Sequence, residues 1–224
     1  MNCAVILDMD GVIIDSNPFH RMAWAAFLER HGVIVNEHMF KNVIFGTTGD
    51  QAIRNLLQPP ELTADQLTRY TEEIDTSYRS IISGSEQIFP VDGLNNFLDF
   101  IKELGFKIAL ATSAPPENIS LILERLGITE YFDVIVDKTQ VTNGKPDPEV
   151  YQKTVENLKT DSEYCVVFED SLSGVRSAIQ AGIRVIGVTT SHTAEELSQA
   201  GTFYNIDDFN DPSLPEMLAT ISAY

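Results

Sequence analysis

The chain has 224 residues, 43% of them hydrophobic, and a formal net charge of −18. This length suits one large globular domain or one domain with an insertion. The acidic balance argues against nucleic acid and against an anionic membrane surface as partners. It also repels a phosphorylated substrate at long range, so any attraction of such a substrate must be local.

No apolar run reaches membrane-spanning length, and the chain opens directly on an apolar strand. We therefore expect no membrane contact, no signal peptide and a cytoplasmic location. Cys3 and Cys165 lie inside apolar runs, where a small buried thiol is the usual state, so we expect neither a disulfide nor a metal role for them. We also expect a monomer.

The first predicted strand is the apolar run that ends at Leu7 and leads into Asp8-Met9-Asp10-Gly11. In an open α/β sheet, ligands collect at the carboxyl ends of such strands. Side chains 8 and 10 of an extended segment point to one side, so two anions face each other unless a cation or a proton lies between them. Mg²⁺, a hard cation that prefers oxygen ligands, meets this need. The alternative is a turn in which Asp10-Gly11 only reverses the chain.

A block with helical periodicity and few strand signals follows this strand and continues to about Phe89-Pro90. Apolar residues between positions 19 and 28 share one helical face, and His31-Gly32 end that predicted helix. A further amphipathic helix is predicted from Leu62 to Ile82, behind a cap at Thr63. The block therefore predicts a helical insertion over residues 17–89.

From Val91 onward, predicted helices and strands alternate, which is typical of βαβ units around a parallel sheet. The predicted elements are a helix to Leu104, a strand to Thr112, a helix to Leu126, a strand at residues 134–136, a helix to Leu158, a strand to Phe168, a helix to Ala181 and a strand to Val188. The predicted fold class is thus α/β, with a Rossmann-like parallel sheet core formed by residues 1–16 and 90–224. A loop and a capped helix are predicted after Ser191, and no chemistry is assigned to them.

Polar groups follow two further predicted strands at the points where they end. Thr112-Ser113 follow one strand and Glu169-Asp170-Ser171 follow another, while Lys145 lies in a Gly/Pro-rich loop between them. Lys145 is the only basic residue near these strand ends. The alternatives are a solvated loop lysine and a helix cap at Thr112-Ser113, since Pro115 and Pro116 come next.

These segments, in this order, resemble the motifs of haloacid dehalogenase-type phosphotransferases, and the resemblance covers essentially the whole chain. Asp8-Met9-Asp10-Gly11-Val12 match the first motif, Thr112-Ser113 the second, Lys145-Pro146 the third, and Glu169-Asp170-Ser171 with Gly174 the fourth. The resemblance implies that Asp8 is a nucleophile forming an aspartyl-phosphate and that Asp10 is the general acid and base. It further implies that Thr112 and the Ser113 N–H hold phosphoryl oxygens, that Lys145 neutralises charge, and that Asp8, Asp10, Glu169 and Asp170 bind Mg²⁺.

The chemistry agrees with these implied roles. A phosphate monoester is an anion, so a carboxylate can approach it only if a cation and a lysine cancel charge on both partners. A covalent intermediate needs a nucleophile and a separate proton donor, which Asp8 and Asp10 can provide.

The helical insertion resembles the small helical cap of the β-phosphoglucomutase subgroup. Ser16, His20 and Trp24 occupy the positions of that subgroup's hydroxyl, imidazole and indole, and Gly46-Thr47-Thr48 with Gly49 resemble its cap loop. His20 and Trp24 lie one helical turn apart and share a face, which suits contact with Asp10 and with a sugar. The alternative is a core Trp and a solvated His.

Departures from the mutase pattern favour a phosphatase. Gly49 stands where an arginine is expected, and Ala114 and Pro116 stand where a serine and an asparagine are expected. Each lost charge-assisted hydrogen bond to a second phosphate would cost roughly 1.5–3 kcal/mol. We therefore expect a phosphatase that acts on a small phosphorylated metabolite, with a sugar phosphate as the substrate class and water as the final acceptor.

Other functions stay open at this point. A mutase is possible if Arg54 or another cation replaces the missing donors. A phosphonate hydrolase would need a Schiff-base lysine, and Lys41 is the only lysine in residues 17–89. A non-catalytic binding protein would be expected to have lost a motif residue, and none is lost. Dehalogenation is disfavoured because Asp10, Glu169 and Asp170 together imply a metal, which the resemblance does not associate with the haloacid dehalogenases themselves.

Overall fold

The computed structural model describes residues 3–44, 49–57 and 62–222. Within these residues, six strands pair in parallel in the order β3-β2-β1-β4-β5-β6. The strands are β1 Ala4–Leu7, β2 Lys107–Ala111, β3 Val134–Val136, β4 Cys165–Glu169, β5 Arg184–Val188 and β6 Tyr204–Ile206. The predicted α/β class with a parallel, Rossmann-like sheet is confirmed.

Register aligns the ends of the three central strands. Leu7 of β1 is level with Leu110 of β2 on one side and with Phe168 of β4 on the other. The residues that follow these positions therefore come out side by side at the carboxyl edge of the sheet. This edge is where ligands bind in open α/β sheets.

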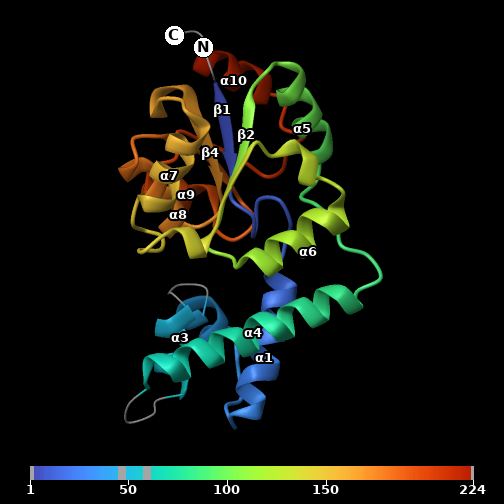
Figure 1. Ribbon diagram of the computed structural model, residues 1–224, viewed down its shortest axis with the longest axis vertical. Helices are drawn as coiled ribbons and strands as arrows, with labels where there is room; N and C mark the ends of the chain where they lie inside the picture. Colours follow the sequence, from blue (N-terminus) through green and yellow to red (C-terminus); the bar gives the residue numbers. More distant parts are fainter. Residues whose placement is uncertain (1–2, 45–48, 58–61, 223–224) are drawn as a thin grey trace. The chain divides into compact units, whose positions relative to one another are not determined.

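Helices cover both faces of the sheet. The central strands β1 and β4 are therefore buried on both sides and consist almost entirely of apolar residues. One face packs on α7 Glu149–Leu158, α8 Leu172–Gln180 and α9 Ala194–Ala200, and the other on α5 Leu94–Glu103 and α10 Leu214–Ser222 (Figure 1). On the α5 side, the ring of Phe97 lies edge-on to Phe168 of β4, with their centroids 5.2 Å apart. The helix α6 Pro116–Leu126 follows β2.

The chain divides into two compact units, one made of Met1–Asp15 with Ile88–Tyr224 and the other of Ser16–Gln87. The second unit contains α1 Asn17–Arg30, α2 Glu37–Met39, α3 Gly49–Leu57 and α4 Ala64–Gly84. Short helical turns lie at Phe40–Ile44 in this unit and at Thr129–Tyr131, Lys138–Gln140 and Ser162–Tyr164 in the first. The long predicted helix is thus present, and a capping box between Thr63 and Gln66 begins it.

Packing between α1 and α4 holds the helical unit together. Phe27 of α1 meets Tyr70 of α4 edge-on at 5.5 Å between ring centroids, and Arg30 Nε lies 2.8 Å from Glu73 Oε1. Among the described residues, no helix is long and apolar enough to cross a bilayer.

One local prediction is wrong. The chain is not extended from Asp8 to Asp10, because β1 ends at Leu7 and a tight loop follows. The carbonyl of Met9 accepts hydrogen bonds from the N–H groups of Val12 and Ile13, and Gly11 takes a positive φ of 79°. This loop, and not strand alternation, therefore sets the position of Asp10. The expected repulsion between the two carboxylates is present all the same, because after burial the Asp10 charge is among the causes that raise the pKa of Asp8.

Candidate active site

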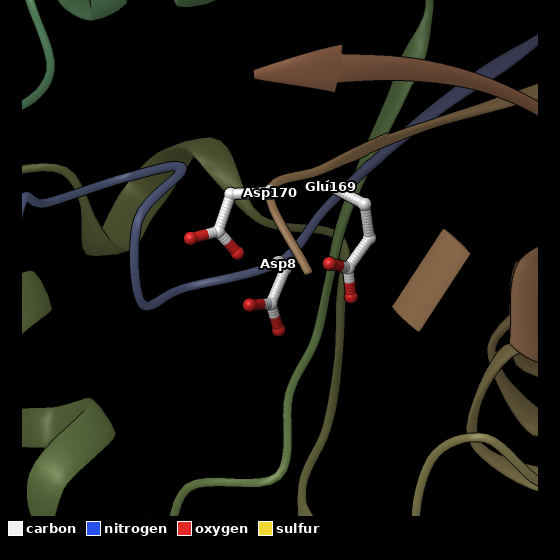
Figure 2. A group of neighbouring side chains, drawn as sticks. All are labelled: Asp8, Glu169 and Asp170. Atoms are coloured by element: carbon white, nitrogen blue, oxygen red, sulfur yellow. The ribbon is translucent and has the colours of Figure 1, made fainter. Parts of the chain in front are cut away.

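Three buried carboxylates meet at the carboxyl edge of the sheet. Asp8 follows β1, Glu169 ends β4, and Asp170 comes next, and one carboxylate oxygen of each lies within 4.8 Å of the others. Figure 2 shows the three side chains converging on a common space. Asp8 is held in place by its N–H, which donates to the Phe168 carbonyl at 3.1 Å.

Lys145 joins two of these carboxylates. Its ammonium group has three protons, and it donates to Asp8 Oδ1 at 2.8 Å, to Glu169 Oε1 at 2.7 Å and to the Ala111 carbonyl at 3.1 Å. The nitrogen also lies 5.0 Å from the centroid of the Tyr151 ring. The lysine is therefore a buried, fully hydrogen-bonded cation and not the solvated loop residue that was the alternative.

The Lys145 loop is fixed from α8. The Ser177 hydroxyl donates to the Asp147 carbonyl at 2.6 Å, and the Gln180 amide donates to the Pro146 carbonyl at 3.1 Å. These bonds tie the loop to the helix that begins just after Glu169 and Asp170. The helix α8 therefore holds the Lys145 loop at the same strand end from which Glu169 and Asp170 project.

Glu169 has no acceptor capacity to spare. Its Oε1 accepts from Lys145 Nζ and from the buried Tyr151 hydroxyl at 2.9 Å, and its Oε2 accepts from the Ser171 N–H at 3.0 Å and the Ser171 hydroxyl at 2.9 Å. A carboxylate offers about four lone-pair sites. The structure thus places Glu169 in the acidic cluster but directs its oxygens to donors of the protein, as the counter-ion of Lys145.

Two glycines make room for the acidic side chains. A Cβ at Gly11 would lie 1.8 Å from Asp170 Oδ2, and one at Gly174 would lie 1.7 Å from Glu169 Oε1. Either side chain would displace a carboxylate. The glycines of the first and fourth motifs are therefore needed for close approach.

Burial and neighbouring charges set the protonation of the cluster. Burial raises the pKa of Asp8 to about 7, against the opposing pull of Lys145. Burial and the Glu169 carboxylate raise the pKa of Asp170 well above its usual range. For Lys145, burial lowers the pKa, but Asp8 and Glu169 outweigh it and hold the pKa well above 10.5. Lys145 in turn outweighs burial at Glu169 and lowers the pKa of that carboxyl.

The residues after β2 offer unused donors. Thr112 is buried, its N–H donates to Val136 at 3.0 Å, and its Oγ1 accepts from the Ala114 N–H at 3.1 Å. Across the part of the chain that the structure describes, neither the Thr112 hydroxyl proton nor the Ser113 N–H has an acceptor. Thr112-Ser113 do not cap α6, whose N-cap is Pro115.

Sequence reasoning missed the segment after β5. The Ser191 hydroxyl donates to Asp170 Oδ2, Thr190 Oγ1 lies 3.3 Å from the same oxygen, and His192 Nδ1 lies 2.9 Å from the Asp170 carbonyl. The missed signal was a hydroxyl-rich run at the carboxyl end of a buried strand, the same pattern that singled out Thr112-Ser113.

The other expected site residues lie in the helical unit. The His20 ring stacks on Tyr78 at 4.2 Å between centroids, and Trp24 is buried and edge-on to Phe27 at 6.1 Å. These contacts favour the structural alternative for Trp24. Ser16 is buried at the start of α1, while Gly46, Thr47 and Thr48 lie outside the described residues.

A parallel α/β core with a lysine and a carboxylate cluster at its strand ends is the arrangement of a phosphate-processing hydrolase. The family model of haloacid dehalogenase-like hydrolases matches residues 5–188, and the chain belongs to this family. It is an enzyme of that family, with relatives in the β-phosphoglucomutase-like phosphatase subgroup.

Similar proteins span nearly the same length. A phosphorylated carbohydrates phosphatase of Thermotoga maritima is 36% identical over 200 residues, covering 88% of this chain and 91% of the relative. A beta-phosphoglucomutase of Bacillus subtilis is 30% identical over 195 residues, covering 83% of this chain and 82% of the relative. The crystal structure of a family IA, variant 3 hydrolase of this type from Entamoeba histolytica matches with a TM-score of 0.90 and 31% identity, over 99% of this chain and 100% of that one.

The donor set fits a hard divalent cation. Three buried carboxylates share one space with Lys145, a single cation, so negative charge remains uncompensated there. Burial is the main cause of the raised pKa values of Asp8 and Asp170, and the neighbouring Glu169 carboxylate raises both further. Oxygen ligands of this kind are those that Mg²⁺ prefers.

Proposed function

We propose that the protein is a Mg²⁺-dependent phosphatase that hydrolyses a small sugar phosphate through an aspartyl-phosphate on Asp8. The observation that carries this proposal is a buried carboxylate, held through one oxygen by Lys145, beside a strand end whose hydroxyl and N–H donors are unused. Such a site pairs a nucleophile with groups that bind an oxyanion.

In the first half-reaction, Asp8 attacks phosphorus and the P–O bond to the leaving group breaks, while Asp10 gives the leaving oxygen a proton. In the second, Asp10 takes a proton from water, which attacks phosphorus and releases inorganic phosphate from Asp8. The Thr112 hydroxyl and the Ser113 N–H bind phosphoryl oxygens, and the Lys145 ammonium offsets the charge that both anions bring together.

Bound Mg²⁺ supplies further neutralisation of the phosphoryl charge. Asp8 and Asp170 would hold it, together with Asp10 from the loop after β1. Glu169, expected from the sequence as a ligand, would contribute its negative charge and keep Lys145 in place, because its oxygens already accept from Lys145, Tyr151 and Ser171.

The sugar phosphate class is supported by the name of the Thermotoga maritima relative. A phosphosugar mutase is the second candidate, favoured by the 30% identity to the Bacillus subtilis beta-phosphoglucomutase. Against a mutase, Gly49 and Ala114 have no polar side chain, so neither supplies a side-chain donor for a second phosphate. Arg54, the substitute considered from the sequence, donates to the Leu62 carbonyl at 3.4 Å.

We further propose that the unit Ser16–Gln87 selects the leaving group, with His20 as its polar contributor and Trp24 as part of its core. The variant His20→Ala should then change the order in which sugar phosphates are preferred, while the release of phosphate from an aryl phosphate stays close to the wild-type rate. Equal losses on all substrates would contradict this role.

The test of the main proposal is phosphate release from a panel of sugar phosphates and other phosphomonoesters, with Mg²⁺ and with EDTA. A coupled assay for isomerisation of β-glucose 1-phosphate, primed with the 1,6-bisphosphate, runs in parallel. We expect metal-dependent release without isomerisation, and loss of release in Asp8→Asn but not in the exposed control Asp65→Asn. Rapid isomerisation would establish the mutase, and turnover by Asp8→Asn would exclude the aspartyl-phosphate.

A further inference from the structure

The segment Thr190–His192, which follows β5, surrounds Asp170 with polar groups. The Ser191 hydroxyl donates to Oδ2, Thr190 Oγ1 lies 3.3 Å from the same oxygen, and His192 Nδ1 lies 2.9 Å from the Asp170 main-chain carbonyl. Because a carbonyl can only accept, Nδ1 of His192 is the donor in that bond. Three consecutive side chains of one loop therefore contact one aspartate.

Counting protons separates the roles of the two hydroxyls. A hydroxyl donates a single proton, and Thr190 directs its proton to the Gly11 carbonyl, 2.6 Å away. Ser191 is then the hydroxyl that donates to Asp170 Oδ2. Thr190 instead holds the turn at Gly11 in place through this hydrogen bond. Asp170 Oδ2 packs closely against that turn, since a Cβ built on Gly11 would lie 1.8 Å from Oδ2.

The two oxygens of Asp170 consequently differ. Oδ2 is enclosed by Ser191, Thr190 and Gly11, whereas Oδ1 has no hydrogen-bond donor anywhere in residues 3–44, 49–57 and 62–222. Asp170 is almost fully buried, so water does little to fix its carboxylate. The hydroxyl of Ser191 thus selects the rotamer of a side chain that would otherwise turn about its own bonds.

We propose that Thr190, Ser191 and His192 are positioning residues that clamp Asp170 so that Oδ1 stays available to a divalent cation. This inference rests on one part of the proposed function, namely that the cluster of Asp8, Glu169 and Asp170 binds a divalent cation. Partners that orient a metal-binding carboxylate commonly change metal affinity 10–100-fold when they are removed. Ser191 is itself exposed, so water can partly replace its hydroxyl, and about a tenfold effect is expected.

The test measures metal affinity directly. Binding of Mn²⁺ is followed by electron paramagnetic resonance, and binding of Mg²⁺ by calorimetry, at one pH, for the wild type and four variants. Ser191→Ala removes the donor, Ser191→Thr restores a hydroxyl, and Thr190→Val keeps the shape while it frees the Gly11 turn. Ser120→Ala, at an exposed position of α6, is the matched control.

We expect about tenfold weaker binding in Ser191→Ala, weaker binding in Thr190→Val, wild-type affinity in Ser120→Ala, and recovery in Ser191→Thr. Unchanged affinity in Ser191→Ala would overturn the proposal, as would a loss that Ser191→Thr fails to recover. A wild type that binds neither ion would also overturn it. Phosphate release is assayed separately, so an absence of phosphatase activity with intact, Ser191-dependent metal binding would reject the proposed function alone.

Discussion

Gly174 allows the sharpest test of how the site is supported. It lies in α8, and a Cβ there would fall 1.7 Å from Glu169 Oε1 and 2.0 Å from Cδ. Gly174→Ala therefore forces Glu169 out of its position and away from its donors. Lys145 would then remain buried with Asp8 as its one carboxylate partner.

The expected change in stability follows from two opposing effects. Breaking a buried ion pair costs about 3–5 kcal/mol. Replacing glycine by alanine inside a helix gains about 1 kcal/mol. We expect the free energy of unfolding to fall by about 2–4 kcal/mol in Gly174→Ala, the opposite of what helix propensity predicts.

Urea unfolding of the metal-free protein, followed by circular dichroism, measures this difference. The control is Gly84→Ala at the end of α4, where nothing lies within 4 Å of a built Cβ. This control should be as stable as the wild type or slightly more so. If Gly174→Ala is as stable as the wild type, Glu169 is not held as described and the support for Lys145 must be reconsidered.

Three further predictions concern buried groups. Tyr151→Phe removes one donor to the Glu169 carboxylate and should lower the free energy of unfolding by about 1.5–3 kcal/mol, and an unchanged urea midpoint would speak against that hydrogen bond. Burial raises the pKa of Cys165 to about 12, so peptide mapping should find this thiol unmodified by iodoacetamide in the native protein and modified after denaturation. Burial raises the pKa of Asp8 from 3.8 to about 7, so in the metal-free protein its protonated form favours folding below about pH 4, and that contribution is lost as the pH rises through about 7. Mg²⁺ competes with this proton, so its effect on the melting temperature should grow between about pH 5 and about pH 8, and an equal effect at both would contradict the raised pKa of Asp8.

The sequence predicted the strands best where a run of apolar residues corresponds to a strand that is buried on both faces of the sheet. Strands β1 and β4 are continuous apolar runs because both faces of a parallel sheet are covered, so their ends, and with them Asp8 and Asp170, could be located in advance. The parallel alignment of those ends then brings the carboxylates together without any further assumption.

Tertiary contacts could not be predicted in the same way. The bond from Tyr151 to Glu169 joins a helix to a strand, and the clamp of Ser191 on Asp170 joins two loops; nothing local in either segment indicates the partner. The short strand β6, Tyr204–Ile206, was missed because its three residues include the polar Asn205, whereas the equally short β3 consists only of β-branched residues and was predicted. The turn after Leu7 was missed because strand alternation was extended past the end of β1.

The most direct test of the mechanism is to look for the phosphate on Asp8 itself. The wild type is mixed with Mg²⁺ and a sugar phosphate that it hydrolyses, quenched in acid during the first turnovers, digested, and examined by mass spectrometry. We expect a phosphorylated peptide that contains Asp8, absent in EDTA and in Asp8→Asn. Steady release of phosphate with no phosphopeptide at any quench time, or with the phosphate on another residue, would contradict Asp8 as the nucleophile.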